Sequence, residues 1–359
     1  KDDKLVKIEG DPRSPVNEGR LCMRCLAMVE AVNHPDRILH PLRRVGERGE
    51  NKWEEITMDE AYAIIAEKAR EVTEEFGPKS IVTGIGTGRN ATWQTSSLAF
   101  AGFKTPNDTA GMLSGDCCYT PRLQAMNAIF GSDFIADCAQ LSAERFDDPE
   151  YRRPDVILNW ACNPVVSNAD GFFGHCLVDL MKRGSRIISI DPRITWVGAH
   201  DGNINLQVRP QTDTALALAI MNLMFENGEY DQEFAEKWIY GLDEMKARAA
   251  EYPVDKVAEI TGVDAEDIKR VAHIIGTERP IGWAWGLAFD QNKNGVQLSQ
   301  AFIVLAALAG SIDRPGGLTL GPPSALLGKW RMEQRGAMDD EVWSKRIGAA
   351  AWPGLSTGM

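Results

Sequence analysis

The chain of 359 residues is long enough for roughly two or three domains with sizeable cores. Its 39 Lys and Arg against 51 Asp and Glu give a formal net charge of −12, which argues against nucleic acid or an anionic membrane as a general partner. The longest apolar run, residues 301–312, is too short to cross a membrane and predicts a buried helix. Seven cysteines at irregular spacing favour reduced thiols with a metal site over a secreted disulfide scaffold.

In chain order, residues 1–45 are rich in Pro, Arg and turn signals, and we expect an irregular segment that lies against the rest of the protein. Residues 57–77 have the pattern of an amphipathic helix, with Thr57 or Asp59 as its N-cap and Gly77 as its end. A strand within 80–88 and a helix near 91–102 follow. The later pattern predicts, in order, a helix just after Cys118, a strand at 154–164, a helix at 170–183, strands at 185–193 and 203–213, a helix at 214–228, helices over 231–277, a strand at 280–287 and a helix at 295–312.

Strands that alternate with helices predict an α/β fold, a doubly wound parallel sheet with helices on both faces, here preceded by the irregular segment. Ligands bind such sheets at the carboxyl ends of the strands. Polar turns follow four of the predicted strands, in the stretches NWACNPVVSNADG, IDPRIT, VRPQTD and GLAFDQNKNG.

Within these turns, Asp191 and Asp213 are placed to accept hydrogen bonds from a purine or a ribose, and Arg193 and Arg209 to meet a pyrophosphate. Each turn by itself could be ordinary loop chemistry, and Asp213 could be only a helix N-cap. Four such turns at one edge of a sheet favour a nucleotide site. The stretch GIGTG at 84–88 lacks the third glycine of the dinucleotide fingerprint, so a direct NAD role for it is not favoured.

Two adjacent cysteines, Cys117 and Cys118, come directly before a predicted helix in SGDCCYTPRLQAM. The dipole and the free N–H groups of a helix N-terminus favour a thiolate, which makes Cys118 a candidate metal ligand or nucleophile. The alternative is that both cysteines are small apolar core residues. The apolar residues of the helix are expected to share one buried face: Leu123, Met126, Ile129 and Phe130.

Taken in order, six motifs resemble those of the molybdenum and tungsten oxidoreductases that bind bis-molybdopterin guanine dinucleotide, the dimethyl sulfoxide reductase superfamily. They are KIEGDPRSPVNEGRLCMR, HPDRILHPLRR, DEAYAIIAEK, IDPRIT, VRPQTDTALALA and NGVQLSQAFIVLAALAGSIDRPGG. The resemblance covers essentially the whole chain and depends on the agreement of the spaced motifs. Two further stretches, EYPVDKVAEITGVDAEDIKRVA and WPGLSTGM, look most similar to acetylene hydratase and catechol dehydroxylase-type enzymes.

The resemblance implies roles for individual residues. Cys118 matches the protein ligand of Mo or W, where a soft thiolate suits the metal beside the dithiolene sulfurs. Cys22 matches the last ligand of a [4Fe–4S] cluster, and Arg24 the basic residue that bridges cluster and pterin. Cys25 stands where the family has a small residue, and we interpret it as structural. The residues expected to hold the cofactor are Arg24, Asn163, Asp191, Arg193, Arg209, Asp213, Gly286 and Gln291.

Two features depart from the family pattern. The other cluster cysteines should precede KLVKIEGDP and a large C-terminal domain should follow, and because this chain has neither, we expect an internal portion of a longer enzyme in which Cys22 is one cluster ligand. The expected domains are 1–45 as the end of the iron–sulfur segment, 46–114 with 315–359 as a first α/β domain, and 115–314 as a Rossmann-like domain for a guanine dinucleotide.

The resemblance implies an anaerobic reduction of a small organic substrate, such as a reductive dehydroxylation, with electrons delivered through the cluster from an iron–sulfur subunit or redox carrier. A non-redox lyase similar to acetylene hydratase and a cofactor-free structural paralogue are the alternatives. Tyr119 favours reduction, because a phenol beside the metal can donate a proton to a leaving hydroxyl where the hydratase has an aliphatic residue. Formate dehydrogenase is disfavoured, since its histidine is Tyr119 here. Both the bacterial cytoplasm and the exported face of a membrane remain open as locations.

Overall fold

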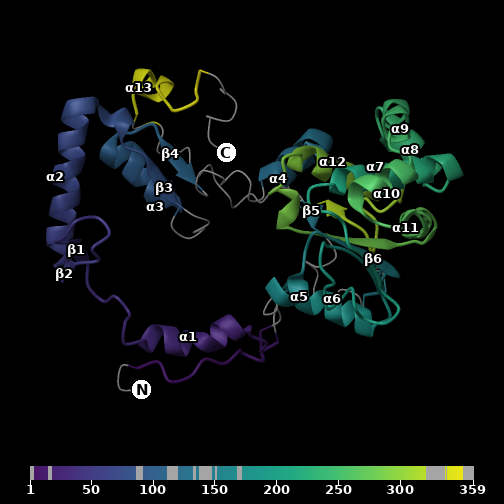
Figure 1. The fold of residues 1–359 in the computed structure, drawn as a ribbon, viewed down its shortest axis with the longest axis horizontal. Helices are drawn as coiled ribbons and strands as arrows, with labels where there is room; N and C mark the ends of the chain where they lie inside the picture. Colours follow the sequence, from purple (N-terminus) through teal and green to yellow (C-terminus); the bar gives the residue numbers. More distant parts are fainter. Residues whose placement is uncertain are drawn as a thin grey trace. The chain divides into compact units, whose positions relative to one another are not determined.

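The computed structural model describes residues 4–14, 18–85, 92–110, 120–131, 135–136, 148–149, 152–167, 172–320, 336 and 338–350. The chain divides into two compact units (Figure 1). Unit 1 contains Lys1–Leu5, Val29–Asp116 and Ser324–Met359, and unit 2 contains Val6–Met28 and Cys117–Pro323. Residues 6–28 therefore belong to the same unit as residues 117–323, while the predicted division into three domains stays a prediction.

Unit 2 is built on a four-stranded parallel sheet with the strand order β8-β7-β6-β9. Its strands are β6 (Val156–Trp160), β7 (Arg186–Ile190), β8 (Ile204–Leu206) and β9 (Ile281–Trp285). In the centre, Leu158 lies opposite Ile188 on one side and Trp283 on the other. All residues of β6 and β9 are buried, because helices cover both faces of the sheet.

The two faces of the sheet carry different helices (Figure 1). Side chains at alternate positions, such as Ile157 and Ile187, pack with α6 (Phe172–Lys182) on one face. The opposite face, with Trp160 and Trp283, packs against α4 (Thr120–Phe130), α7 (Asp213–Asn227) and α12 (Gly295–Leu308). Because the run at 301–312 lies in and just after α12, its apolar side chains belong to this core.

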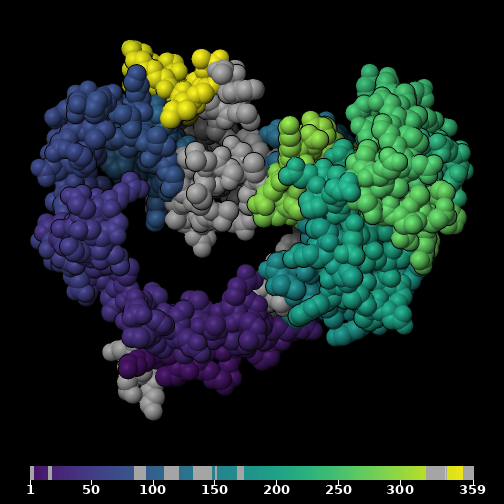
Figure 2. All heavy atoms as spheres, in the orientation of Figure 1, coloured from purple at the N-terminus to yellow at the C-terminus, as the bar shows by residue number. Residues whose placement is uncertain are grey.

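Further helices extend unit 2 beyond the sheet. They are α5 (Pro164–Ser167), α8 (Gln232–Trp238), α9 (Leu242–Ala250), α10 (Val254–Thr261) and α11 (Ala265–Thr277). A short antiparallel pair joins β5 (Ile135–Ala136) to β10 (Thr319–Leu320). In the space-filling view the green residues of α8–α11 form one lobe beside the teal residues of α5 and α6 (Figure 2).

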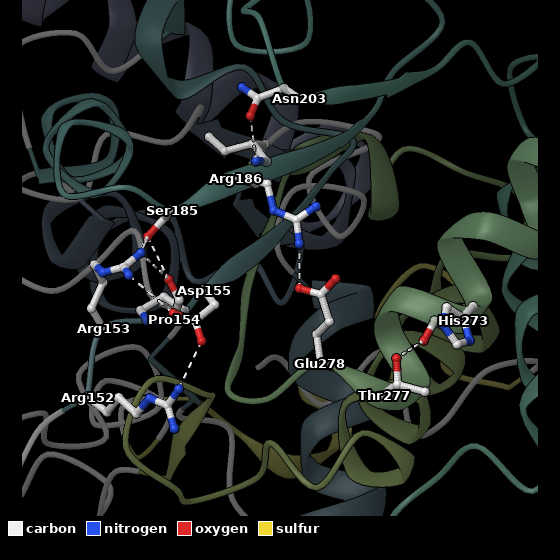
Figure 3. A network of polar contacts seen from close by, with 11 residues as sticks. Arg152, Arg153, Pro154, Asp155, Ser185, Arg186, Asn203, His273, Thr277 and Glu278 are labelled. Atoms are coloured by element: carbon white, nitrogen blue, oxygen red, sulfur yellow. Dashed lines mark hydrogen bonds and ion pairs between the residues drawn. The ribbon is translucent and has the colours of Figure 1, made fainter.

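The amino ends of the strands are closed by a network of ion pairs (Figure 3). Asp155, just before β6, accepts from Arg152 and Arg153, and Arg153 also donates to Ser185 Oγ. At the start of β7, Arg186 pairs with Glu278. These charged groups pair with one another, so the ion pairs at the amino edge of the sheet have a structural role.

Unit 1 contains α2 (Met58–Phe76), β1 (Leu42–Arg44) paired antiparallel with β2 (Trp53–Glu55), and β3 (Thr83–Ile85) paired parallel with β4 (Asp108–Ala110). The remaining elements are a 3₁₀ turn (Pro78–Ser80), α3 (Thr92–Ser97), a π-helical turn (Leu98–Phe103) and α13 (Asp340–Ser344). Phe100 and Trp343 form its small buried cluster with Ala99. Thr57 caps α2 through a reciprocal capping box with Glu60, and Gly77 ends the helix, as the sequence predicts.

The predicted fold class is confirmed, since a parallel sheet with helices on both faces follows the iron–sulfur segment. The description of residues 1–45 as irregular is wrong in part, because they contain α1 (Met23–Asn33), most of whose residues are the good helix formers Met, Arg, Leu, Ala and Glu, and β1. Along α4, Met126 is buried, but Ile129 is 40% exposed rather than part of the core face. None of the helices in the described part of the chain combines the length and the apolar composition that a membrane span requires.

Candidate functional site

The carboxyl ends of the four strands bring the predicted turns to one edge of the sheet. The chain leaves β6 towards α6 on one face of the sheet, and it leaves the neighbouring strand β9 towards α12 on the other face. Two adjacent strands whose connections diverge in this way open a crevice between their ends, where α/β proteins bind their ligands. The predicted turns therefore surround a topological switch point.

Asp191 and Arg193 form an ion pair at the end of β7. The Asp191 carboxylate accepts from Arg193 Nε at 3.1 Å and from its backbone N–H at 2.9 Å. Asp191 is 4% exposed, whereas 71% of the Arg193 side chain is exposed. This contact raises the pKa of the Arg193 guanidinium, which stays charged at the open side of the turn. The pair thus presents a cation to the solvent.

Asp213 lies at the start of α7, where Thr212 is the N-cap residue. The N-cap explanation for Asp213 is therefore wrong, because Asp213 is already inside the helix. Its Oδ1 accepts from the indole Nε1 of buried Trp160 at 2.9 Å. Burial raises the pKa of the Asp213 carboxyl, the Trp160 hydrogen bond opposes this rise, and the nearby Asp191 charge adds to it. The carboxylates of Asp191 and Asp213, which follow two adjacent strands, therefore lie close enough for the charge of Asp191 to affect Asp213.

The raised pKa of Asp213 predicts a pH-dependent stability. The folded chain holds this proton more tightly than the unfolded chain, so stability falls as the pH rises from the ordinary value of 3.8 through the raised one. Asp213→Asn keeps an acceptor for Trp160 and has no proton to lose. We expect the variant to gain free energy of unfolding relative to wild type across this interval, measured by urea unfolding at about pH 4 to about pH 7. A difference in the free energy of unfolding between the two proteins that does not change with pH would contradict the raised pKa of Asp213.

Asn163 and Gly286 lie in the loops that end β6 and β9. The Asn163 side chain has a buried Oδ1 without a hydrogen-bond partner in the described part of the chain, while its backbone carbonyl accepts from Ser167. A Cβ on Gly286 would lie 2.2 Å from the carbonyl oxygen of Ala161, so glycine is needed for the two loops to approach. Ala161 itself has a φ of +55°, a strained conformation of the kind found at binding sites.

Arg209 and Gln291 differ from the other predicted residues. The Arg209 guanidinium donates to the carbonyls of Glu259 and Ile260, at 3.1 and 2.6 Å, and so holds the C-terminus of α10. Gln291 is exposed in the turn after β9. Their roles in binding stay predictions, and for Arg209 the contact with α10 is an additional, structural role.

The iron–sulfur segment lies against the β6 turn within unit 2. Arg24 Nη2 donates to the carbonyl oxygen of Ser167 at 2.9 Å, and Arg20 pairs with Asp179 of α6 at 3.6 Å. Cys22 is buried, with its Sγ 3.8 Å from that of Cys25. The structure therefore brings Cys22 and Arg24 to the same edge as Asn163. Cys117, Cys118 and Tyr119 lie outside the described residues, directly before the first residue of α4.

Comparison with known proteins now decides the family. The molybdopterin oxidoreductase family model matches residues 37–327, and the molybdopterin oxidoreductase Fe4S4 domain matches residues 1–34. The chain belongs to the molybdopterin oxidoreductase family. It is 32% identical to an acetylene hydratase of Syntrophotalea acetylenica over 356 residues, 98% of this chain and 46% of that protein.

Other relatives agree with this membership. A dimethyl sulfoxide reductase of Haemophilus influenzae is 28% identical over 350 residues, 89% of this chain and 42% of that protein. Among solved structures, acetylene hydratase from Pelobacter acetylenicus superimposes with a TM-score of 0.74 at 30% identity, over 94% of this chain and 44% of that one. The chain thus spans about half the length of the curated relatives it matches. The two family domains imply a Mo or W pterin cofactor and a [4Fe–4S] cluster.

The edge of the sheet fits the nucleotide part of such a cofactor. Guanine offers two N–H donors side by side, and ribose offers hydroxyls, which suit the carboxylates of Asp191 and Asp213. The unpartnered Oδ1 of Asn163 is a further acceptor. Among the described residues no three His, Cys, Asp or Glu side chains gather as a metal site, and Cys118 lies outside that part of the chain. The described residues can therefore be compared with the nucleotide and with the cluster segment, and not with the metal.

Sequence reasoning missed two residues at this edge. Arg122 of α4 and Asp290 of the turn after β9 form a buried ion pair, with Nη2 2.8 Å from Oδ2. Asp290 lies within the stretch GLAFDQNKNG, in which only Gly286 and Gln291 are predicted site residues, and Arg122 follows Cys118 by four residues. The available signal is that Arg122 is the one charged residue of α4, but nothing in the pattern identifies its partner.

Proposed function

We propose that unit 2 holds one guanine nucleotide of a bis-molybdopterin cofactor, and that the protein reduces a small organic substrate with electrons from the [4Fe–4S] cluster. The observation that carries the proposal is that Asp191, Asp213 and Asn163 meet at one sheet edge, against which Arg24 of the cluster segment lies. The bound cofactor supplies a redox-active metal. The side chains of this chain supply binding, orientation and proton transfer.

Each residue has a defined role in this proposal. Asp213 and Asp191 accept hydrogen bonds from guanine or ribose, and the exposed Arg193 guanidinium pairs with a phosphate. Cys118 is the protein ligand of the metal. Tyr119 donates a proton to the leaving hydroxyl of the substrate, for which a phenol beside the ligand is suited.

Asp213→Asn tests the nucleotide site. The variant keeps the hydrogen bond from Trp160 but lacks the charge, so it should lose about 1–3 kcal/mol of nucleotide binding, which is roughly 5- to 150-fold in affinity. We expect less guanine nucleotide per protein after acid release and chromatography of the full-length enzyme. Asp155→Asn is the matched control, because Asp155 lies at the opposite edge of the same sheet and pairs with Arg152. Full guanine content in Asp213→Asn would leave Asp213 with a structural role alone.

Metal and pterin analysis of the full-length protein, purified without oxygen and followed by a substrate screen, tests the proposal as a whole. Protein without metal or pterin would instead support the cofactor-free structural paralogue. A water-adding lyase is the second candidate, supported by the similarity to acetylene hydratases. We further propose an iron–sulfur subunit or a redox carrier as the electron partner, which the reductase needs and the lyase does not.

A further inference from the structure

Two cysteines lie at the start of α1, in the stretch CMRC. Cys22 directly precedes Met23, the first residue of the helix, and the Leu26 N–H donates to the Cys22 carbonyl oxygen at 3.2 Å. Cys22 is therefore the N-cap residue, and Cys25 is the third residue of the helix. Residues three apart on a helix are neighbours on its surface, so both thiols lie on the same side of the first turn.

The two sulfur atoms are in contact. The Cys22 thiol donates to Cys25 Sγ at 3.8 Å. A disulfide needs the sulfurs about 2.0 Å apart, so the first turn must tighten for the bond to form. The end of a helix permits this movement, because the N-cap residue does not have helical dihedral angles and the first N–H groups have no partner within the helix. The spacing Cys-x-x-Cys is also that of thiol pairs that alternate between dithiol and disulfide.

The two cysteines differ in their access to solvent. Cys22 is 7% exposed, whereas Cys25 is exposed to an intermediate degree. On either side of Cys22, Arg20 pairs with an aspartate of α6 and Arg24 donates to a carbonyl of the β6 turn. These contacts hold Cys22 against the rest of unit 2, so a reagent in solution reaches the Cys25 sulfur before that of Cys22.

We propose that Cys22 and Cys25 form a reversible disulfide in protein that does not hold its [4Fe–4S] cluster. The oxidant is a low-molecular-weight disulfide. The Cys25 thiolate attacks one sulfur of this oxidant, forms a mixed disulfide and releases one thiolate. The Cys22 thiolate then attacks the Cys25 sulfur, forms the protein disulfide and releases the second thiolate. Two protein thiols lose two electrons, the oxidant gains them, and the two thiol protons pass to the released thiolates.

The disulfide makes cluster assembly dependent on reduction. Iron is bound by a cysteine thiolate, so Cys22 cannot be a cluster ligand while its sulfur is bonded to that of Cys25. A reducing thiol restores the pair by the same exchange in reverse. This role goes beyond the structural one expected for Cys25, and it rests on the proposed function, in which Cys22 is a ligand of the cluster.

The test uses the full-length protein, purified without oxygen, both with its cluster and after iron has been removed by a chelator. Each preparation is incubated with glutathione disulfide, and the remaining thiols are alkylated. Trypsin cleaves after Arg20, Arg24 and Arg37, which places Cys22 and Cys25 in separate peptides, residues 21–24 and 25–37. Mass spectrometry then detects the disulfide as a cross-link between these two peptides, with and without added reductant.

We expect at least about tenfold more cross-linked peptide in the cluster-free protein, because a thiolate bound to iron cannot attack a disulfide. Cys25→Ser should abolish the cross-link. Cys176→Ser, the matched control, should retain it, because Cys176 is a buried thiol within α6.

Two results would overturn the inference, and they differ in what they imply for the cluster. Cluster-free protein in which Cys22 and Cys25 stay alkylated, carry only glutathione or pair with other cysteines would exclude the disulfide and leave the proposed function intact. Equal cross-linking with and without the cluster would show that iron does not protect Cys22, and would overturn its role as a cluster ligand as well.

Discussion

Cys118→Ser is expected to abolish or strongly alter the absorption and EPR signals of the metal in the full-length enzyme. A serine hydroxyl is a harder and weaker ligand for Mo or W than a thiolate, and it is not ionised at neutral pH without the metal. The effect should be the largest of any single substitution in this chain, because it removes the proposed protein ligand itself. The measurement is EPR and visible absorption, together with Mo and W content, on protein purified without oxygen.

Cys117→Ser is the matched control, since it makes the same change one residue earlier. We expect it largely to keep the signals of the metal. Equal loss of signal from both substitutions would leave the assignment to Cys118 without support. Loss from Cys117→Ser alone would transfer the role of ligand to Cys117.

Arg24→Met is expected to lower turnover with an external electron donor by more than tenfold, while Mo or W content stays near normal. A tenfold loss corresponds to about 1.4 kcal/mol in the activation barrier. The guanidinium stays charged at all working pH values, so it can stabilise the more negative reduced state next to the cluster. Methionine keeps the bulk of the side chain but removes its charge and its hydrogen bond to Ser167. Iron, Mo or W, and turnover are measured on one preparation.

The same variant separates the two candidate functions. A reductase loses turnover because electrons must pass the position of Arg24, whereas a lyase needs no net electron flow there and should keep most of its rate. If Arg24 only holds the loop against Ser167, the variant should lose the cluster together with activity. Arg13→Met provides the control, because Arg13 lies in the same segment and its exposed side chain pairs with Asp11. Unchanged reductive turnover with an intact cluster would exclude the bridging role.

Residues of the site differ in how far the sequence could predict them. The turns after β6, β7, β8 and β9 were predicted because polar residues at the end of a buried strand are a local pattern. Their chemistry was harder to predict. The pattern predicts that Arg209 meets a pyrophosphate, which stays a prediction, but it does not indicate that the guanidinium also holds carbonyls of α10, 50 residues or more along the chain. The pattern allows Asp213 to be a cap or a ligand, and the structure removes the first explanation because Thr212 is the N-cap residue of α7.

The sequence by itself determined the α/β fold and the order of the main elements of the parallel sheet, and its motifs indicated the family. Helix caps such as Thr57 and buried apolar strands such as β6 depend on residues nearby in the sequence. The resemblance to the family depends on the agreement of six spaced motifs. Only the tertiary structure decided which strand ends are neighbours, that Arg24 contacts the β6 turn, and that Arg122 binds Asp290, 168 residues away. Such pairs depend on strand order and on helix packing, and periodicity along the chain contains no information on either.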